Sequence, residues 1–379
     1  MNPKQSTIHR PSDLRSLLFM LAIVVIFSSA CGQSRAPAEN SMQLSRKLVL
    51  ETSRHDIREI HYGNCHPSPG NEIVIAGYQG ASLISRDYRE LAHVEFDERL
   101  ARLDVVDMSG DGTCEFLDRG MGWHSTGLLD HEGKLAWSLE DEMGIHDIAA
   151  GDLDDDGFLD LVVAETGGLR RHDHTGRLVW EIPTSLIHRV GIVDIDYDGR
   201  NEIVHDADSD HIHLRDKHGI LREEIQFREV STLDFSIIEP GPPFPPHLII
   251  GAFSSERWLA TFDGWVRGRL EVPDAVDDVW STEVWSTMVR FQPGTPFAVA
   301  LLFSKRDMGT PAILQLYDGD GDVVFRAEHD RSCWALAKVP GDRRREERLL
   351  VGCGTQLWEY SLDVDSRADG EQPAGEAGH

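Results

Sequence analysis

The sequence predicts an all-β fold, a seven-bladed β-propeller made of four-stranded antiparallel blades. An acidic loop occurs three times at intervals of about 42 to 45 residues, which is about the length of one four-stranded blade. A hairpin turn with a short apolar strand on either side recurs with the same rhythm. Because a propeller of this size closes on itself, we expect one ring of blades and not two separate domains.

The acidic loop is clearest in residues 151–165, GDLDDDGFLDLVVAE. Its carboxylates alternate along the chain and a glycine takes the sixth position, which is the spacing of a calcium-binding loop. These residues are Asp152, Asp154, Asp156, Gly157 and Asp160. In an EF-hand a helix would follow, but here the next segment is an apolar, β-branched run. We therefore expect the loop to join two strands.

Two further copies keep this spacing. The earlier copy consists of Asp107, Ser109, Asp111, Gly112 and Glu115. The later copy consists of Asp194, Asp196, Asp198, Gly199 and Glu202. Three copies in register, each leading into a strand, indicate a repeat and not a chance run of turn residues.

The acidic loops and the hairpin turns together divide the chain into seven units. These units begin near His55, Leu103, Ile145, His188, Val230, Val279 and Ser332. Asp318, Asp320 and Asp322 imitate the acidic alternation, but Val323 stands where a glycine is needed. Their place in the repeat is the turn between the third and fourth strands, so we interpret them as a structural turn.

The last unit supplies no clear fourth strand of its own. Residues 43–51, QLSRKLVLE, form a strand-like segment that has no partner nearby in the sequence. We predict that this N-terminal strand completes the last blade and closes the ring, because closure removes exposed sheet edges. The propeller is then expected to span residues 43–365, and the acidic tail 366–379 to be disordered.

Residues 1–30 have the character of a targeting segment. Three cationic residues precede an apolar run that is too short to span a bilayer comfortably, and small residues then lead to Cys31. This arrangement resembles a bacterial lipoprotein signal, in which the cysteine is lipidated, and residues 31–42 would be a tether. Ordinary cleavage after Ala30 and an uncleaved membrane anchor are the alternatives. We expect an exported cell-envelope lipoprotein at the outer membrane or cell surface, or otherwise a periplasmic or secreted protein.

The formal charge of -28 argues against nucleic-acid binding, because phosphate needs a cationic surface. Without Cys31, four cysteines remain, an even number that suits an oxidising compartment. Pairing of Cys65 with Cys114 and of Cys333 with Cys353 is one of three connectivities, and four free thiols are the alternative.

The acidic loops, DLDDDGFLDLVV and DIDYDGRNEIV among them, resemble the FG-GAP/VCBS repeats of integrin-alpha-like calcium-loop propellers. The resemblance implies Ca²⁺ in the two four-carboxylate loops and a third, weaker site in the loop with one carboxylate fewer. Carbonyl oxygens at the seventh loop position are implied as additional ligands, namely those of Phe158, Arg200 and Thr113. The alternative is that the loops are Asx-turn hairpins that hold no metal tightly.

No catalytic motif stands out in the sequence. Histidines at alternate positions, such as His211 and His213, would share one face of a strand. They admit a transition-metal site, but we favour solvated or strand-packing histidines. Basic and aromatic residues in the expected loops between second and third strands are candidates for partner contact. They are Trp123, His124, Arg257, Trp258, Lys305 and Arg306.

Two functions are compatible with these features. The first is a non-catalytic binding or scaffold module whose partner is an unknown protein or glycan. The second is a calcium-dependent carbohydrate-active enzyme, a polysaccharide lyase or hydrolase, which would need a base opposite a metal or an arginine. We favour the binding module because no set of candidate residues has a fixed catalytic spacing.

Overall fold

The computed structural model describes residues 42–362, with gaps at 64, 66–71, 98–99, 101–102, 120–124, 141–143, 185, 208–209, 228–229, 231, 233, 242–243, 252–255, 274–281, 293–294, 306–309 and 342–345. The predicted signal segment, Cys31, the tether before residue 42 and the acidic tail lie outside these residues. Within the described residues there is no helix, and hence none long and apolar enough to cross a membrane.

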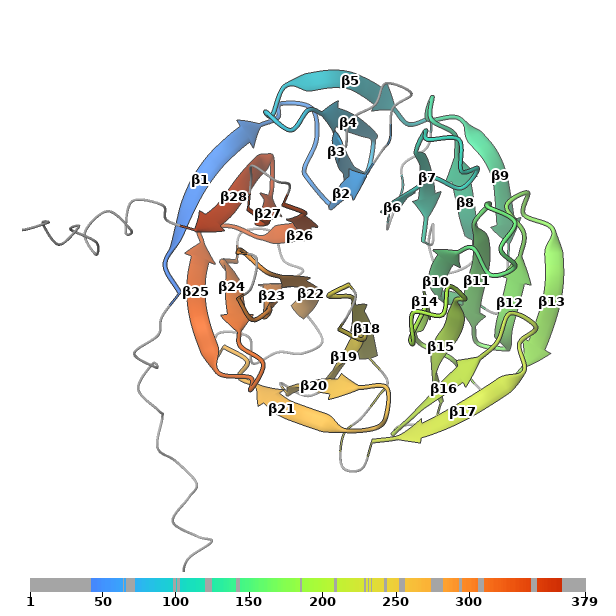
Figure 1. The fold of residues 1–379 in the computed structure, drawn as a ribbon. Helices are drawn as coiled ribbons and strands as arrows, with labels where there is room; N and C mark the ends of the chain where they lie inside the picture. The colour runs from blue at the N-terminus through green and yellow to red at the C-terminus, as the bar shows by residue number, and fades with distance from the viewer. Residues whose placement is uncertain are drawn as a thin grey trace, which may run out of the picture. The chain divides into compact units, whose positions relative to one another are not determined.

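Seven four-stranded antiparallel sheets form a ring, which confirms the predicted propeller (Figure 1). Figure 1 shows the first strand of each blade around the centre and the fourth strand on the outside. The first strands are β2 (Glu59–Gly63), β6 (Leu103–Val106), β10 (Ile145–Gly151), β14 (Val190–Val193), β18 (Asp234–Ile238), β22 (Thr282–Val289) and β26 (Cys333–Val339). The second strands are β3 (Glu72–Gly77), β7 (Glu115–Asp118), β11 (Asp160–Glu165), β15 (Glu202–Ala207), β19 (His247–Gly251), β23 (Ala298–Lys305) and β27 (Arg348–Cys353).

The outer half of each blade is built in the same way. The third strands are β4 (Gly80–Ile84), β8 (Ser125–Leu129), β12 (Gly168–His172), β16 (His211–Arg215), β20 (Arg257–Thr261), β24 (Ala312–Tyr317) and β28 (Gln356–Leu362). The fourth strands are β5 (Glu90–Glu95), β9 (Leu135–Glu140), β13 (Leu178–Pro183), β17 (Leu221–Gln226), β21 (Val266–Leu270), β25 (Val323–His329) and β1 (Leu44–Glu51). We number the blades one to seven in the order of β2, β6, β10, β14, β18, β22 and β26.

The N-terminal strand closes the ring, as predicted. β1 pairs antiparallel with β28, from Leu44 opposite Leu362 to Glu51 opposite Gln356. The seventh blade therefore combines three strands from the end of the described chain with one from its beginning. This arrangement leaves no blade open between the two ends of the propeller.

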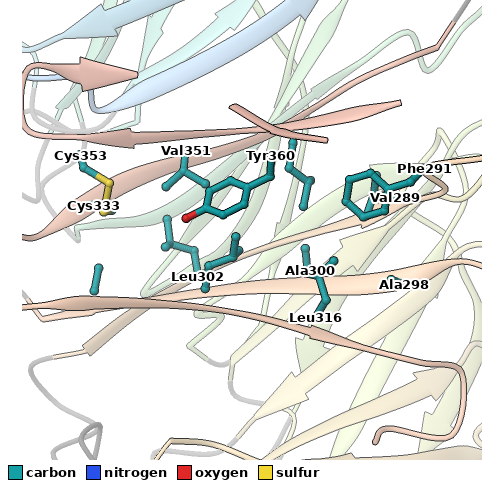
Figure 2. Close-up of a cluster of buried hydrophobic side chains, with 13 residues drawn as sticks. Val289, Phe291, Ala298, Ala300, Leu302, Leu316, Cys333, Val351, Cys353 and Tyr360 are labelled. Carbon is teal, nitrogen blue, oxygen red and sulfur yellow. A yellow bond between two sulfur atoms is a disulfide. The ribbon is translucent and has the colours of Figure 1, made fainter. Parts of the chain in front are cut away.

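Strand burial follows from the position of each strand in its blade. Every residue of β11, a second strand, is buried, because the sheet faces a neighbouring blade on both sides. Four of the six residues of the outermost strand β13 are exposed, in a pattern typical of an outer edge. The core therefore lies between consecutive blades. Figure 2 shows this packing between blades six and seven, where Val289 and Leu302 meet Val351 and Tyr360.

The turns between third and fourth strands also join neighbouring blades. The indole N–H of Trp137 donates to the His174 carbonyl oxygen at 3.3 Å, and that of Trp180 to the Lys217 carbonyl at 2.9 Å. Each tryptophan thus reaches the turn of the following blade and has a structural role. The turn at Asp318 joins β24 to β25, which confirms its predicted place between the third and fourth strands of a blade.

Two disulfides join the four described cysteines in the connectivity that the blade alignment suggested. Cys65–Cys114 links the first two blades through their loops between first and second strands. Cys333–Cys353 links the first two strands of blade seven, near the joint with blade six (Figure 2). One covalent link therefore joins blades one and two, and the other lies within blade seven.

The core between blades six and seven yields a first prediction. Leu302 is fully buried there, so we expect Leu302→Ala to lower the free energy of unfolding by about 2–5 kcal/mol. Leu135→Ala is the control, because Leu135 is 45% exposed and should cost no more than about 0.5 kcal/mol. Urea unfolding of the two variants measures this difference, and equal losses would contradict the assigned core.

Candidate functional site

The three acidic loops lie where the sequence placed them, between the first and second strands of blades two, three and four. Because equivalent turns of a propeller emerge at one face of the ring, the loops share a face. We call this the loop face. The opposite face carries the connections between second and third strands.

The three loops have one backbone conformation. The aspartate at position one accepts a hydrogen bond from the N–H of the glycine at position six, at 2.9–3.0 Å. The carboxylate at position nine accepts one from the N–H at position two, at 2.7–3.2 Å. The position-six glycines have φ of 82°, 87° and 88°, which side chains rarely tolerate. These glycines are Gly112, Gly157 and Gly199.

Carboxylates converge in two of the loops. Asp152, Asp154 and Asp160 each place one oxygen within 4.8 Å of the others. Asp194, Asp196 and Asp198 do the same. The loop of blade two is not among the groups of described residues that converge in this way, which agrees with its lower carboxylate count. Asp111 there accepts hydrogen bonds from Thr113, which lower the pKa of the Asp111 carboxyl.

The gathered negative charge has an electrostatic cost. Burial raises the pKa of Glu202, and the neighbouring carboxylates of Asp194, Asp196 and Asp198 raise it further. Only the N–H of Ile195 acts in the opposite direction. A cation placed among these oxygens would relieve both the repulsion and the desolvation.

Blade three already has such a cation within the chain. The Arg171 guanidinium lies 2.5 Å from an Asp154 oxygen and 2.8 Å from an Asp160 oxygen. Its side chain is only 4% exposed. By strand register, the equivalent residue is Leu214 in blade four and Leu128 in blade two. The oxygen set of blade four therefore fits a bound cation best, since the guanidinium competes for the same oxygens in blade three.

The loops of blades three and four have the same number of carboxylates, and the loop sequences alone do not reveal Arg171. The residue lies on β12, the third strand, 11 residues after Asp160. Alignment of the third strands by blade would have shown an arginine where the other two blades have leucine.

The loops of successive blades are connected on the loop face. The Leu159 N–H donates to the Met108 carbonyl at 3.0 Å, which joins the loop of blade three to that of blade two. The Asn201 side-chain amide donates to the Asp152 carbonyl at 2.8 Å, which joins blade four to blade three. Cys114 is bonded to Cys65 in blade one. The candidate metal loops thus form one chain of contacts across four blades.

The residues expected to contact a partner are only partly described. Trp123, His124 and Arg306 lie outside the described residues. Lys305 is the last residue of β23, at the edge of the expected loop.

The expectation of a loop at Arg257 and Trp258 was wrong, because both belong to β20. Gly251, which pairs with Arg257, has no side chain, and the guanidinium occupies that space. Arg257 is buried and forms an ion pair with Asp234 at 3.4 Å. Its environment is therefore that of a structural ion pair.

Arg257 belongs to a run of ion pairs that sequence analysis missed. Arg119 contacts Asp104 at 3.2 Å and also Asp147 in the next blade. Arg189 lies 4.0 Å from Asp147 and 3.0 Å from Asp234. The run crosses blades two to five at the face opposite the loops, since its carboxylates stand near the beginnings of the first strands. We call it the ion-pair belt.

The belt favours the charged form of Arg119. Burial lowers the pKa of Arg119, but the carboxylates of Asp104 and Asp147 outweigh it, and the net shift is upward. Acidic residues at the start of three first strands were the sequence signal that would have revealed the belt. The belt ties neighbouring blades together through side chains, as the core does through apolar contacts.

Comparisons with known proteins place the chain in a fold class. No protein-family model matches the sequence, and no curated protein matches it. Among solved structures it is similar to the propeller in two crystals of BBS1N in complex with ARL6DN, one soaked with lead and one with mercury. The TM-scores are 0.56 and 0.57 at 13% and 12% identity, and each match covers 86% of this chain and 97% of the other. The chain is a seven-bladed β-propeller.

Arg171 provides a test of the loop of blade three. We expect Arg171→Leu to lower the unfolding free energy in chelator by about 1–3 kcal/mol, because the buried Asp160 oxygen loses its charged donor and keeps only the Leu153 N–H. Calcium should restore this loss, since the freed oxygens then accept the ion. Thermal melts in chelator and in calcium measure both effects.

Arg170→Leu is the matched control. Arg170 pairs with Glu165 at 3.1 Å and with Glu181 at 3.8 Å, and neither glutamate belongs to the acidic loop. Its replacement should also cost stability, but calcium should not restore it. Equal calcium responses in the two variants would contradict the proposed role of Arg171.

Proposed function

We propose that the protein is a calcium-stabilised, non-catalytic binding module that is exported and anchored at the cell envelope. The observation that carries the calcium part is the loop of blade four, where Asp194, Asp196 and Asp198 converge near Glu202 and the third strand has Leu214 at the position of Arg171. Asp194, Asp196, Asp198 and Glu202 would hold the ion, and the Arg200 carbonyl would complete the oxygen set. Calcium suits such a set because it accepts six to eight oxygen ligands in flexible geometry.

The proposed role of the ion is structural. The loop carboxylates come from both ends of the connection between β14 and β15, so a shared ion would hold the two strands together. Asn201 lies in the same loop and contacts the loop of blade three. An ion that orders the loop of blade four would thus also restrain the loop of blade three through Asn201, and the loop face would become more rigid.

The binding role is supported by the architecture and by the similar structures. A closed propeller presents two broad faces built from connecting loops, and such loops commonly carry recognition. BBS1N has a similar fold, and its crystal structure is of a complex with ARL6DN. We propose a protein partner for this chain as well. The charged residues of the ion-pair belt pair with one another, which supports a structural role for them and not a catalytic one.

Export is proposed from the sequence of residues 1–31 and is supported by the two disulfides. Disulfides persist in oxidising compartments and are rare in the cytosol. The proposed lipid anchor is Cys31.

Calcium stabilisation can be tested directly. Calcium at about 100 times its dissociation constant stabilises a protein by about 2.7 kcal/mol, so the melting temperature of chelator-treated protein should rise by several degrees. Asp196→Asn should reduce this rise, because it removes a proposed ligand. Asp320→Asn is the control, since Asp320 belongs to the acidic turn that the fold assigns a structural role. An unchanged melting temperature on calcium addition would contradict the proposal.

The non-catalytic assignment has its own test. We expect the full chain to show no turnover of acidic polysaccharides with calcium present, while a screen of envelope proteins detects saturable binding. Product formation is measured by release of reducing ends. Robust turnover would contradict the proposed binding module and would favour a calcium-dependent carbohydrate-active enzyme.

A further inference from the structure

Two phenylalanines and an arginine meet on the loop face, over blades five and six. Phe244 belongs to the proline-rich connection between β18 and β19, and Phe297 ends the equivalent connection of blade six, just before β23. Their rings meet edge to face, with centroids 4.9 Å apart. The guanidinium carbon of Arg290 lies 3.8 Å from the Phe297 centroid and 5.1 Å from that of Phe244. Two rings therefore hold one guanidinium. We call these three residues the arginine–aromatic cluster.

The guanidinium of Arg290 has no carboxylate partner among the residues that the structure describes. The backbone N–H of Arg290 donates to Glu347 Oε2 at 2.6 Å, but the side-chain Nε is buried without a hydrogen-bond partner. In the ion-pair belt, by contrast, Arg119 and Arg189 each contact two aspartates. In a chain with a formal charge of -28, Arg290 is thus a cation that can still accept a carboxylate from outside.

The cluster is also held by the acidic loop of blade four. The Tyr197 hydroxyl donates to the Phe244 carbonyl at 2.7 Å. Tyr197 has φ of 58°, a left-handed conformation that few side chains adopt. It lies between Asp196 and Asp198, so the backbone turn that gathers these carboxylates also directs the phenol toward blade five. The Phe244 N–H closes a turn by donating to the Gly241 carbonyl at 3.2 Å. The segment that carries Phe244 is therefore fixed by its own turn and by the neighbouring blade.

We propose that the arginine–aromatic cluster is a docking site for a protein partner, and that it accepts a single carboxylate flanked by apolar residues. The inference rests on the proposed function as a protein-binding module. Arg290 would pair with the carboxylate, because a guanidinium matches its two oxygens. Phe244, which is 42% exposed, would pack against the apolar neighbours. Arginine and aromatic residues are enriched in the cores of protein interfaces, where they contribute much of the binding energy.

The surrounding charge limits the kind of partner. Glu239 lies at the start of the proline-rich connection, and Glu347 contacts the backbone of Arg290. The acidic loop of blade four adjoins the cluster through Tyr197. These carboxylates would repel a polyanion, such as a nucleic acid or a run of acidic residues. A segment with one carboxylate gains the pairing with Arg290 and adds little negative charge, and its apolar residues suit the two rings.

The test begins with selection from a random phage-displayed peptide library on the full chain, with excess calcium in every step. We expect the enriched peptides to share one aspartate or glutamate among apolar residues. One of them is synthesised with this carboxylate and with the corresponding amide, and fluorescence anisotropy measures both affinities. The amide peptide should bind at least about tenfold more weakly, because a hydrogen bond between two charged groups is lost.

Arg290→Gln is the matching change in the protein. It should weaken binding of the carboxylate peptide by a similar factor and leave binding of the amide peptide unchanged, because both changes remove the same contact. Arg267→Gln is the control, since Arg267 also lies over an exposed aromatic ring, that of Trp265 at 5.7 Å, but on the outer strand β21. It should leave both affinities unchanged. Melting temperatures without peptide verify that each variant is folded.

Several results would overturn the proposal. One is that no peptide is enriched, or that the enriched peptides lack a carboxylate. Another is that the carboxylate and amide peptides bind the unchanged chain equally well, a comparison that requires no variant. Binding of an oligouronate to Arg290 in place of any peptide would point to a glycan. A dimer of the full chain that Arg290→Gln dissociates would make a second copy the occupant.

The peptide measurements are separate from those of the proposed function. Turnover of acidic polysaccharides or an absent calcium response would contradict the proposed function without changing the affinities of the two peptides. Equal affinities of the two peptides would remove the docking site and leave the calcium response as it is. The two proposals therefore fail separately.

Discussion

The structure depends on closure of the ring. Each blade has two apolar faces, and only the two neighbouring blades can bury both of them. Ile57, Ile73 and Ile75 of blade one therefore need Leu350 and Leu357 of blade seven, although these residues are far apart in the chain. The pairing of β1 with β28 brings the two ends together and supplies the last blade with its outer strand. Without that pairing, the apolar faces at the joint would be exposed to water.

Charge is the second constraint, because the formal charge is -28. The carboxylates have two different environments. At the face opposite the loops, arginines such as Arg119 and Arg189 alternate with aspartates of neighbouring blades. On the loop face Arg171 pairs with Asp154 and Asp160 of its own blade, whereas blade four has Leu214 at the equivalent position. The difference between two loops with the same spacing of carboxylates thus lies in a residue outside either loop.

The loop face is more than a set of separate hairpins. Main-chain and amide contacts run from blade two to blade four, and the Cys65–Cys114 disulfide extends them to blade one. A displacement of one loop therefore changes hydrogen bonds that it shares with the neighbouring loops. This continuity gives a physical reason to consider the loops as one surface, held by the same contacts that keep the blades in register.

The sequence by itself determined the features that repeat. The period predicted seven blades, the position-six glycines predicted the loop conformation, and the unpaired segment 43–51 predicted the closing strand. These features are local, because spacing and turn residues fix backbone conformation within a few residues. Only the tertiary structure decided that Arg171 enters an acidic loop and that Arg257 is buried on Gly251. Those contacts follow from strand register, which places side chains from different strands opposite one another and leaves no mark in the spacing of either strand.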